Sequence, residues 1–186
     1  MTLERLKKGH TYGYLHSAIL RNGISLSIIP PVTIDGVTVS STEIRIALEG
    51  GNPELANAFL TRPYYIQSEV INGQHLGRTL GFPTINQTFP PQKAIPLHGV
   101  YLSRVLFNNT VKYGITNVGL RPTVGSDTVY AETNIFDFNE NLYGVLVKTE
   151  LLHFLRGEQK FSSLEKLSAQ VKQDIEKAKQ LLSNYQ

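Results

Sequence analysis

The sequence predicts a mainly β protein, a small antiparallel barrel or sandwich with a C-terminal α-helix, preceded by a short α/β segment. The first observation is a series of short runs rich in β-branched and aromatic residues, beginning near residue 64. The second is an apolar pattern spaced three and four residues apart after residue 162, which is typical of an amphipathic helix. The third is the mixed helix and strand character of residues 1–61. Together these patterns favour an antiparallel β fold flanked by helical segments.

The strand-like runs are separated by short connections, which favours antiparallel neighbours. Asn108-Asn109 predicts a tight hairpin turn, because asparagine tolerates the left-handed conformations that such turns need. Residues 139–141 are expected to reverse the chain in the same way. The runs expected to form strands are residues 64–71, 99–107, 111–118, 129–138 and 144–155.

Capping signals predict where the helices begin. Ser40 and Glu43 have capping-box spacing, so a helix should begin after Ser40 and end at Gly50-Gly51. Asn52-Pro53 should begin another, with proline at the first helical position, and residues 162–165 form a second capping box. Earlier in the chain, residues 25–32 predict a short strand ended by prolines. The helical side chains expected to face inward are Ile44, Ala47, Leu48, Leu55, Ala56, Phe59, Leu60, Leu164, Leu167, Val171, Ile175, Ala178 and Leu182.

The composition indicates a soluble globular protein with one compact domain, or one domain and a fragment. Of 186 residues, 41% are hydrophobic and 18% charged, which argues against extensive disorder. The absence of cysteine excludes disulfides, thiol catalysis and cysteine-ligated zinc. A net charge of +3 suits an anionic small-molecule substrate, but no run of Lys and Arg marks a nucleic-acid surface. No apolar run reaches membrane-spanning length, so we expect a cytoplasmic protein that binds neither nucleic acid nor membrane.

The segment 77–86, Gly-Arg-Thr-Leu-Gly-Phe-Pro-Thr-Ile-Asn, is suited to wrapping a phosphate and holding a hard metal ion. Pro83 biases Phe82 toward an extended conformation, and in an extended chain Thr84 and Asn86 point to the same side. Their hydroxyl and amide oxygens are plausible ligands for Mg²⁺. The segment matches neither a P-loop nor a Rossmann signature, and a purely structural loop is the alternative.

One carboxylate lies in a strand-like run where it could face a substrate. Alternation places Tyr130, Glu132, Asn134 and Phe136 on one face of that run. Glu132 could therefore accept a proton from a substrate hydroxyl. An exposed strand carboxylate without a chemical role is the alternative.

Several segments, taken together and in order, resemble bacterial riboflavin kinase over residues 62–184. They are residues 73–86 (GQHLGRTLGFPTIN), 115–119 with 121–123, 131–138, 142–144 and 154–165. The resemblance implies a six-stranded antiparallel Greek-key β-barrel with the C-terminal helix packed outside. It also implies the reaction of ATP with riboflavin to give FMN and ADP.

The resemblance further implies roles for single residues. The family's catalytic carboxylate falls on Glu132, which would take the proton of the ribityl 5′-hydroxyl while Mg²⁺ neutralises charge on the γ-phosphoryl group. The implied Mg²⁺ ligands are Thr84 and Asn86. The residues implied for ATP and ADP are Gly73, Gly77, Arg78, Gly81, Pro83 and Thr84. Those implied for riboflavin and FMN are Asn117, Arg156, Phe161 and Leu164, with Arg156 near either the isoalloxazine or the new phosphate.

The resemblance also divides the chain, with the kinase barrel at residues 62–186. Residues 1–61 resemble the C-terminal end of the nucleotidylyltransferase (FAD synthetase) module of the bifunctional riboflavin kinase/FAD synthetase, whose S-S-T-x-I-R motif matches residues 40–45. That module's H-x-G-H motif has no counterpart in this sequence, so we expect no FAD synthesis by this chain. The alternatives to a riboflavin kinase are that the chain is part of a bifunctional riboflavin kinase/FMN adenylyltransferase, or that it is a flavin-binding barrel without catalysis. The sequence identifies no protein partner.

Overall fold

The computed structural model describes residues 29–73, 77, 81–123 and 126–184. It contains two compact units, Met1–Thr38 and Val39–Gln186. In the first unit, β1 (Thr33–Ile34) pairs antiparallel with β2 (Val37–Thr38) across a turn at Asp35-Gly36, where both φ angles are positive. The strand predicted over residues 25–32 is wrong for residues 29–32, which form no regular element because consecutive prolines cannot donate ladder hydrogen bonds. Residues 25–28 lie outside the described residues.

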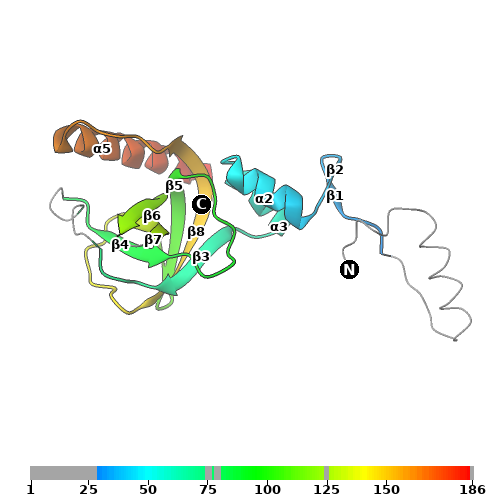
Figure 1. Ribbon diagram of the computed structural model, residues 1–186, viewed down its shortest axis with the longest axis horizontal. Coiled ribbons are helices and arrows are strands. Elements are labelled where there is room, and N and C mark those ends of the chain that lie inside the picture. Colours follow the sequence, from blue (N-terminus) through cyan, green and yellow to red (C-terminus); the bar gives the residue numbers. More distant parts are fainter. Residues whose placement is uncertain (1–28, 74–76, 78–80, 124–125, 185–186) are drawn as a thin grey trace, which may run out of the picture. The chain divides into compact units, whose positions relative to one another are not determined.

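The second unit contains an antiparallel sheet of six strands (Figure 1). These are β3 (Tyr64–Glu69), β4 (Thr84–Thr88), β5 (Gly99–Phe107), β6 (Thr110–Thr123), β7 (Ser126–Ile135) and β8 (Leu146–Gly157). Their order is β3-β8-β5-β6-β7-β4. Strand β8 returns to lie beside β5, the first strand of the β5-β6-β7 meander, which is a Greek-key arrangement. The predicted six-stranded Greek-key architecture is therefore confirmed.

The two ends of the strand order approach each other, so the sheet curls into a half-closed barrel. Ile71 forms an antiparallel bridge with Asn86, which joins the end of β3 to β4. Inside, the Gln87 side chain donates to the carbonyl oxygens of Ser68 at 3.2 Å and Val147 at 2.8 Å. The Thr149 hydroxyl donates to Gln87 Oε1 at 2.6 Å. These contacts fix β4, the strand that carries the predicted metal ligands.

The five runs from residue 64 onward that were predicted to be strands form strands, and the turn at Asn108-Asn109 is confirmed by φ angles of 45° and 59°. Strand β7 ends at Ile135 rather than residue 138, because Phe136-Asp137 form a turn with Asp137 at a φ of 50°. The chain thus begins to reverse before residues 139–141. Strand β4 was expected only as a possible extended stretch within the glycine-rich segment.

Helices α2 (Ser41–Glu49) and α3 (Pro53–Leu60) begin where their capping residues predict. Ser40 Oγ accepts from the Glu43 amide at 3.2 Å, and Asn52 Oδ1 accepts from the Leu55 amide at 3.0 Å. Asn57 of α3 donates to the Leu151 carbonyl at 2.9 Å, which ties the helix to β8. The prediction that Leu55 faces inward is wrong, since it is 37% exposed and the buried side chains of α3 are Pro53, Ala56 and Phe59.

Helix α5 (Leu164–Leu181), followed by the short 3₁₀ helix η2 (Leu182–Asn184), lies over β6 and β8 (Figure 1). Its N-cap is Ser163 rather than Ser162, with Ser163 Oγ accepting from the Lys166 amide at 3.3 Å. A hydrogen bond with Ser163 lowers the pKa of the Glu165 carboxyl. Leu164, the first residue of the helix, is 49% exposed, against the prediction that it faces inward. The helix packs through Val171, Ile175 and Ala178 against a cluster that includes Val100, Leu102, Ile115 and Leu152.

Candidate functional site

A row of paired residues crosses five strands of the sheet and gathers the predicted site residues. Asn86 on β4 pairs with Glu132 on β7, and Glu132 pairs with Asn117 on β6. Asn117 pairs with Val100 on β5, which pairs with Arg156 on β8. Directly opposed residues of an antiparallel sheet point to the same face. Residues far apart in the sequence therefore share one surface.

That surface lines a cavity of about 370 Å³, called the larger cavity below. The strands form one wall, and α5 with the segment before it forms the other. Six predicted site residues line it, namely Gly77, Thr84, Asn117, Glu132, Arg156 and Phe161. The other lining residues are Phe82, Val100, Ile115, Asn134, Glu158, Gln159, Leu167, Val171 and Asp174.

The predicted catalytic carboxylate contacts the predicted metal ligand directly. Thr84 Oγ1 donates to Glu132 Oε1 at 2.8 Å. Thr84 is paired across the strands with Asn134, whose side-chain amide donates to the Pro83 carbonyl at 2.9 Å. Gly77 lies against the same corner, since a Cβ there would come within 2.5 Å of the Phe82 carbonyl oxygen. Backbone pairing and a close glycine contact therefore hold the Thr84–Glu132 pair in place.

A smaller cavity of about 300 Å³ adjoins the first and shares Thr84 with it. Pro83 and Asn86 line this smaller cavity but not the larger one. Gly73 packs so closely on the Asn86 side chain that an added Cβ would collide with its amide. The remaining lining residues are Val70, Ile85, Asn139, Glu140, Asn141, Leu142 and Tyr143. Thr84 thus lies where the two cavities meet.

The donor set at this junction fits a hard divalent cation. Thr84 contributes a hydroxyl oxygen, Asn86 an amide oxygen and Glu132 a carboxylate, which are the oxygen donors that Mg²⁺ prefers. Asn86 is only 3% exposed, so its side chain is held in place by packing. Among the described residues, no group of three or more His, Cys, Asp or Glu could hold a metal ion. A cation at Thr84 and Asn86 would therefore complete its coordination with water and substrate oxygens.

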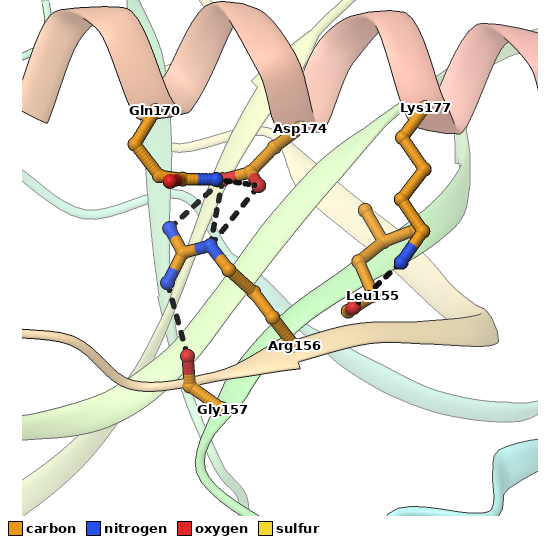
Figure 2. Close-up of polar contacts among 6 residues, drawn as sticks. All are labelled: Leu155, Arg156, Gly157, Gln170, Asp174 and Lys177. Atoms are coloured by element: carbon orange, nitrogen blue, oxygen red, sulfur yellow. Dashed lines mark hydrogen bonds and ion pairs between the residues drawn. The ribbon is translucent and has the colours of Figure 1, made fainter.

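At the β8 end of the strand wall, Arg156 is hydrogen-bonded to Asp174 of α5, the helix of the opposite wall (Figure 2). Its Nε donates to both Asp174 oxygens at 3.0 Å, and its Nη2 donates to Asp174 Oδ2 at 2.8 Å. The sequence interpretation placed Arg156 at the flavin but missed Asp174. A signal existed, because Asp174 interrupts the apolar positions Val171, Ile175 and Ala178 on the inward side of the helix.

Glu158 is a second residue that the sequence interpretation missed. Its carboxylate lies against Gly119, where a Cβ would collide with Glu158 Oε1. His98 Nδ1 lies 3.7 Å from Glu158 Oε2, so this histidine stands beside the rim of the larger cavity. A signal that could have indicated this approach is Gly119, which has no side chain to exclude the Glu158 carboxylate.

Three predicted site residues that the structure describes line neither cavity, namely Gly73, which contacts the Asn86 side chain, Gly81 and Leu164. Leu164 does not line the larger cavity, so its predicted flavin contact is not supported. Gly81 has a φ of 83°, which suits a turn, and, its chain neighbours aside, no atom of the described residues lies within 4 Å of a Cβ built there. Arg78 lies outside the described residues.

The family model described as Flavokinase (riboflavin kinase) matches residues 60–182. The bifunctional riboflavin kinase/FMN adenylyltransferase of Haemophilus influenzae is 37% identical over 174 residues, covering 93% of this chain and 56% of that protein. The Bacillus subtilis protein of the same name is 36% identical over 161 residues, covering 85% and 51%. The chain therefore spans about half the length of the curated relatives it matches.

A solved structure, described as a macrolide-efflux protein from Streptococcus pneumoniae, superposes with a TM-score of 0.79 at 31% identity. The match covers 91% of this chain and 55% of that chain. Within the part of this chain that the structure describes, no helix has the length and apolar character needed to cross a membrane.

Proposed function

The chain belongs to the riboflavin kinase family, and on that premise we propose that it transfers the γ-phosphoryl group of ATP to the 5′-hydroxyl of riboflavin, giving FMN and ADP. The observation that carries the proposal is the 2.8 Å hydrogen bond between Thr84 and Glu132 at the junction of the two cavities. A base and a metal ligand in contact, between two substrate-sized spaces, are the parts that phosphoryl transfer requires.

The different linings of the two cavities support a division between the substrates. The larger cavity is bounded by apolar side chains from both walls, among them Val100, Ile115, Phe161 and Val171. Such a lining suits the flat isoalloxazine ring of riboflavin. The smaller cavity carries several amide side chains, including Asn86, and suits the phosphates of ATP. The 5′-hydroxyl and the γ-phosphate would then meet at Thr84.

Glu132 is the proposed general base. Its carboxylate accepts the proton of the ribityl 5′-hydroxyl as that oxygen bonds to the γ-phosphorus. The bond between the γ-phosphorus and the bridging oxygen breaks, and ADP leaves. Thr84 orients the carboxylate through its hydrogen bond, and Asn117 lies beside it on the next strand.

Thr84 and Asn86 are the proposed Mg²⁺ ligands. Because the Thr84 hydroxyl donates its proton to Glu132, its oxygen keeps lone pairs for a cation. When bound, the ion would neutralise charge on the phosphate oxygens. Gly73 and Gly77 fit the nucleotide role proposed for them, because a larger residue at either position would disturb Asn86 or the Phe82 backbone. Pro83, Gly81 and Arg78 stay predictions for the nucleotide site.

The product and the setting are also part of the proposal. We expect FMN rather than FAD as the end product, because the sequence lacks the H-x-G-H motif of the adenylyltransferase module. The functional division between residues 1–61 and 62–186 stays a prediction, although α2 and α3 share a compact unit with the barrel. The reaction is proposed to occur in the cytoplasm, where ATP is available.

The test is to incubate the protein with riboflavin, ATP and Mg²⁺ and to separate riboflavin, FMN and FAD by chromatography. We expect FMN in equal amount to ADP, with no FMN when Mg²⁺ is chelated. Riboflavin binding without FMN formation would instead support a flavin-binding barrel without catalysis. Appearance of FAD would show that this chain carries a second activity.

A further inference from the structure

Arg156 and Asp174 form a largely buried ion pair in the wall of the larger cavity (Figure 2). Their side chains are 17% and 5% exposed. Gln170, one turn earlier on α5, donates to Asp174 Oδ1 at 3.0 Å and so orients the carboxylate. A carboxylate and a guanidinium that are both withdrawn from water are stable only when paired in good geometry. The pair is therefore a fixed feature of this wall.

The pairing leaves a defined part of the guanidinium available to a ligand. Asp174 accepts from Nε and Nη2, and the Gly157 carbonyl accepts from Nη1 at 3.0 Å. These bonds use three of the five N–H donors of an arginine. Within the described part of the chain, no hydrogen bond of Arg156 uses the other two. Arg156 can therefore still donate to an acceptor in the cavity.

The charge of Arg156 is offset where it lines the cavity. The Asp174 carboxylate neutralises the guanidinium at hydrogen-bond distance, so the pair as a whole presents little net charge. The Phe161 ring lies 5.8 Å from the guanidinium carbon, and the neighbouring lining residues Val100 and Val171 are apolar. A charge-neutralised donor beside these apolar side chains, in a lining that also includes the Glu158 carboxylate, suits an uncharged polar ring better than a phosphate dianion.

We propose that Asp174 is a positioning residue for flavin recognition, which holds Arg156 as a charge-neutralised donor to the acceptor atoms of the uncharged flavin ring rather than as a clamp for the FMN phosphate. The inference rests on the proposed function. Arg156 was expected near either the isoalloxazine or the new phosphate, and the inference selects the isoalloxazine. It also assigns to α5 a part in choosing the substrate.

A simpler role for Asp174 would be to dock α5 on the barrel, and the chain offers a matched control for that role. Lys177, one turn further along α5, donates to the Leu155 carbonyl of β8 at 2.9 Å (Figure 2). This bond ties the same helix to the same strand, but Lys177 does not line the larger cavity. Lys177→Met therefore tests helix docking without touching Arg156.

In the experiment, riboflavin, and separately FMN, is titrated into the full chain. Binding is measured by the quenching of flavin fluorescence. We expect Asp174→Asn to raise the riboflavin Kd about tenfold, with Asp174→Glu recovering part of the loss. Because the freed charge attracts an anion, the FMN Kd should rise less than the riboflavin Kd. Arg156→Met should weaken the binding of both flavins equally.

The control Lys177→Met should leave both Kd values within about twofold of wild type. The kcat of Asp174→Asn at saturating riboflavin should change less than about threefold.

Since Asp174→Asn leaves a buried charge and could unfold the chain, a double variant keeps the test valid. Arg156→Met/Asp174→Leu removes both charges, and it should bind riboflavin as weakly as Arg156→Met alone. The inference is overturned if Arg156→Met weakens FMN at least tenfold more than riboflavin, or if Lys177→Met matches Asp174→Asn. If wild type binds neither flavin, the proposed function itself fails. If wild type binds riboflavin and Asp174→Asn binds it equally well, only this inference fails.

Discussion

The two walls of the larger cavity are built in different ways. On the β4–β7 side, Thr84 and Glu132 lie on adjacent paired strands, and their positions follow from backbone register. On the α5 side, Arg156 is held by an ion pair between a strand and a helix that share no backbone hydrogen bond in this contact. The β4–β7 side, held by backbone pairing, carries the groups proposed to do chemistry. The α5 side, held by a side-chain ion pair, carries those proposed to recognise the flavin. The difference suggests that the two tasks can be separated by mutation.

The largest effect is expected from Glu132→Gln on the β4–β7 wall. The amide cannot accept the proton of the 5′-hydroxyl, so kcat for FMN formation should fall about 10²–10⁴-fold. Initial rates at saturating riboflavin and ATP measure the loss. Glu69→Gln changes an exposed carboxylate on β3 and should leave turnover unchanged. Wild-type turnover by Glu132→Gln would show that another group accepts the proton.

Thr84→Val is the next largest expected change. Valine keeps the shape of threonine but removes both the hydrogen bond to Glu132 and a proposed metal ligand. Loss of a hydrogen bond to a charged group corresponds to roughly a 10–100-fold fall in kcat. The Mg²⁺ concentration at half-maximal rate should rise as well. Thr84→Ser restores the hydroxyl and should recover most of the activity; failure of this rescue would contradict the role of the hydroxyl.

Gly73→Ala tests whether Asn86 belongs to the metal site. The added Cβ would collide with the Asn86 side chain and displace it. We expect about a tenfold higher Mg²⁺ requirement, with little change in the riboflavin Kd. Asn72→Ala alters an exposed neighbour and serves as the control. An unchanged Mg²⁺ titration in Gly73→Ala would remove Asn86 from the proposed ligands.

The smallest expected effect comes from a pair of helix caps. Ser163→Ala and Ser40→Ala each remove a serine that accepts from a backbone amide, at the start of α5 and of α2. Each should lower the free energy of unfolding by about 1 kcal/mol, measured by denaturant titration. Only Ser163→Ala should also raise the riboflavin Kd, by about two- to threefold, because α5 forms a wall of the larger cavity. Equal effects of both variants on the Kd would show that the α5 wall is not sensitive to its cap.

The same contrast explains which features the sequence predicts. Thr84 and Asn86 lie two apart in one short segment, and alternation places Glu132 on one face of its strand, so local patterns marked these residues as candidates, while their roles came from the family resemblance. The pairing of Arg156 with Asp174 joins a strand to a helix, and no local period specifies which residues meet there. Asp174 was visible only as an acidic residue on an otherwise apolar helix face.

The wrong predictions have a similar cause. Helical periodicity placed Leu164 and Leu55 inward, but it does not indicate where a helix extends beyond the sheet that it covers. Leu164 lies in the first turn of α5, after a cap that begins one residue later than predicted. Strand β4 was not predicted with the others because it is only five residues long, directly follows Gly81 and Pro83, and contains Asn86, a residue type depleted in strands. Pairing with β7 and the buried Gln87 contacts supply what its local sequence lacks.

The separation of tasks between the walls is tested most directly by the riboflavin Kd of Glu132→Gln, measured by fluorescence quenching without nucleotide. The two-wall account predicts a Kd within about twofold of wild type, although FMN formation has fallen at least a hundredfold. A Kd that rises in parallel with the loss of turnover would contradict it, because Glu132 would then be part of flavin binding rather than of the chemical step alone.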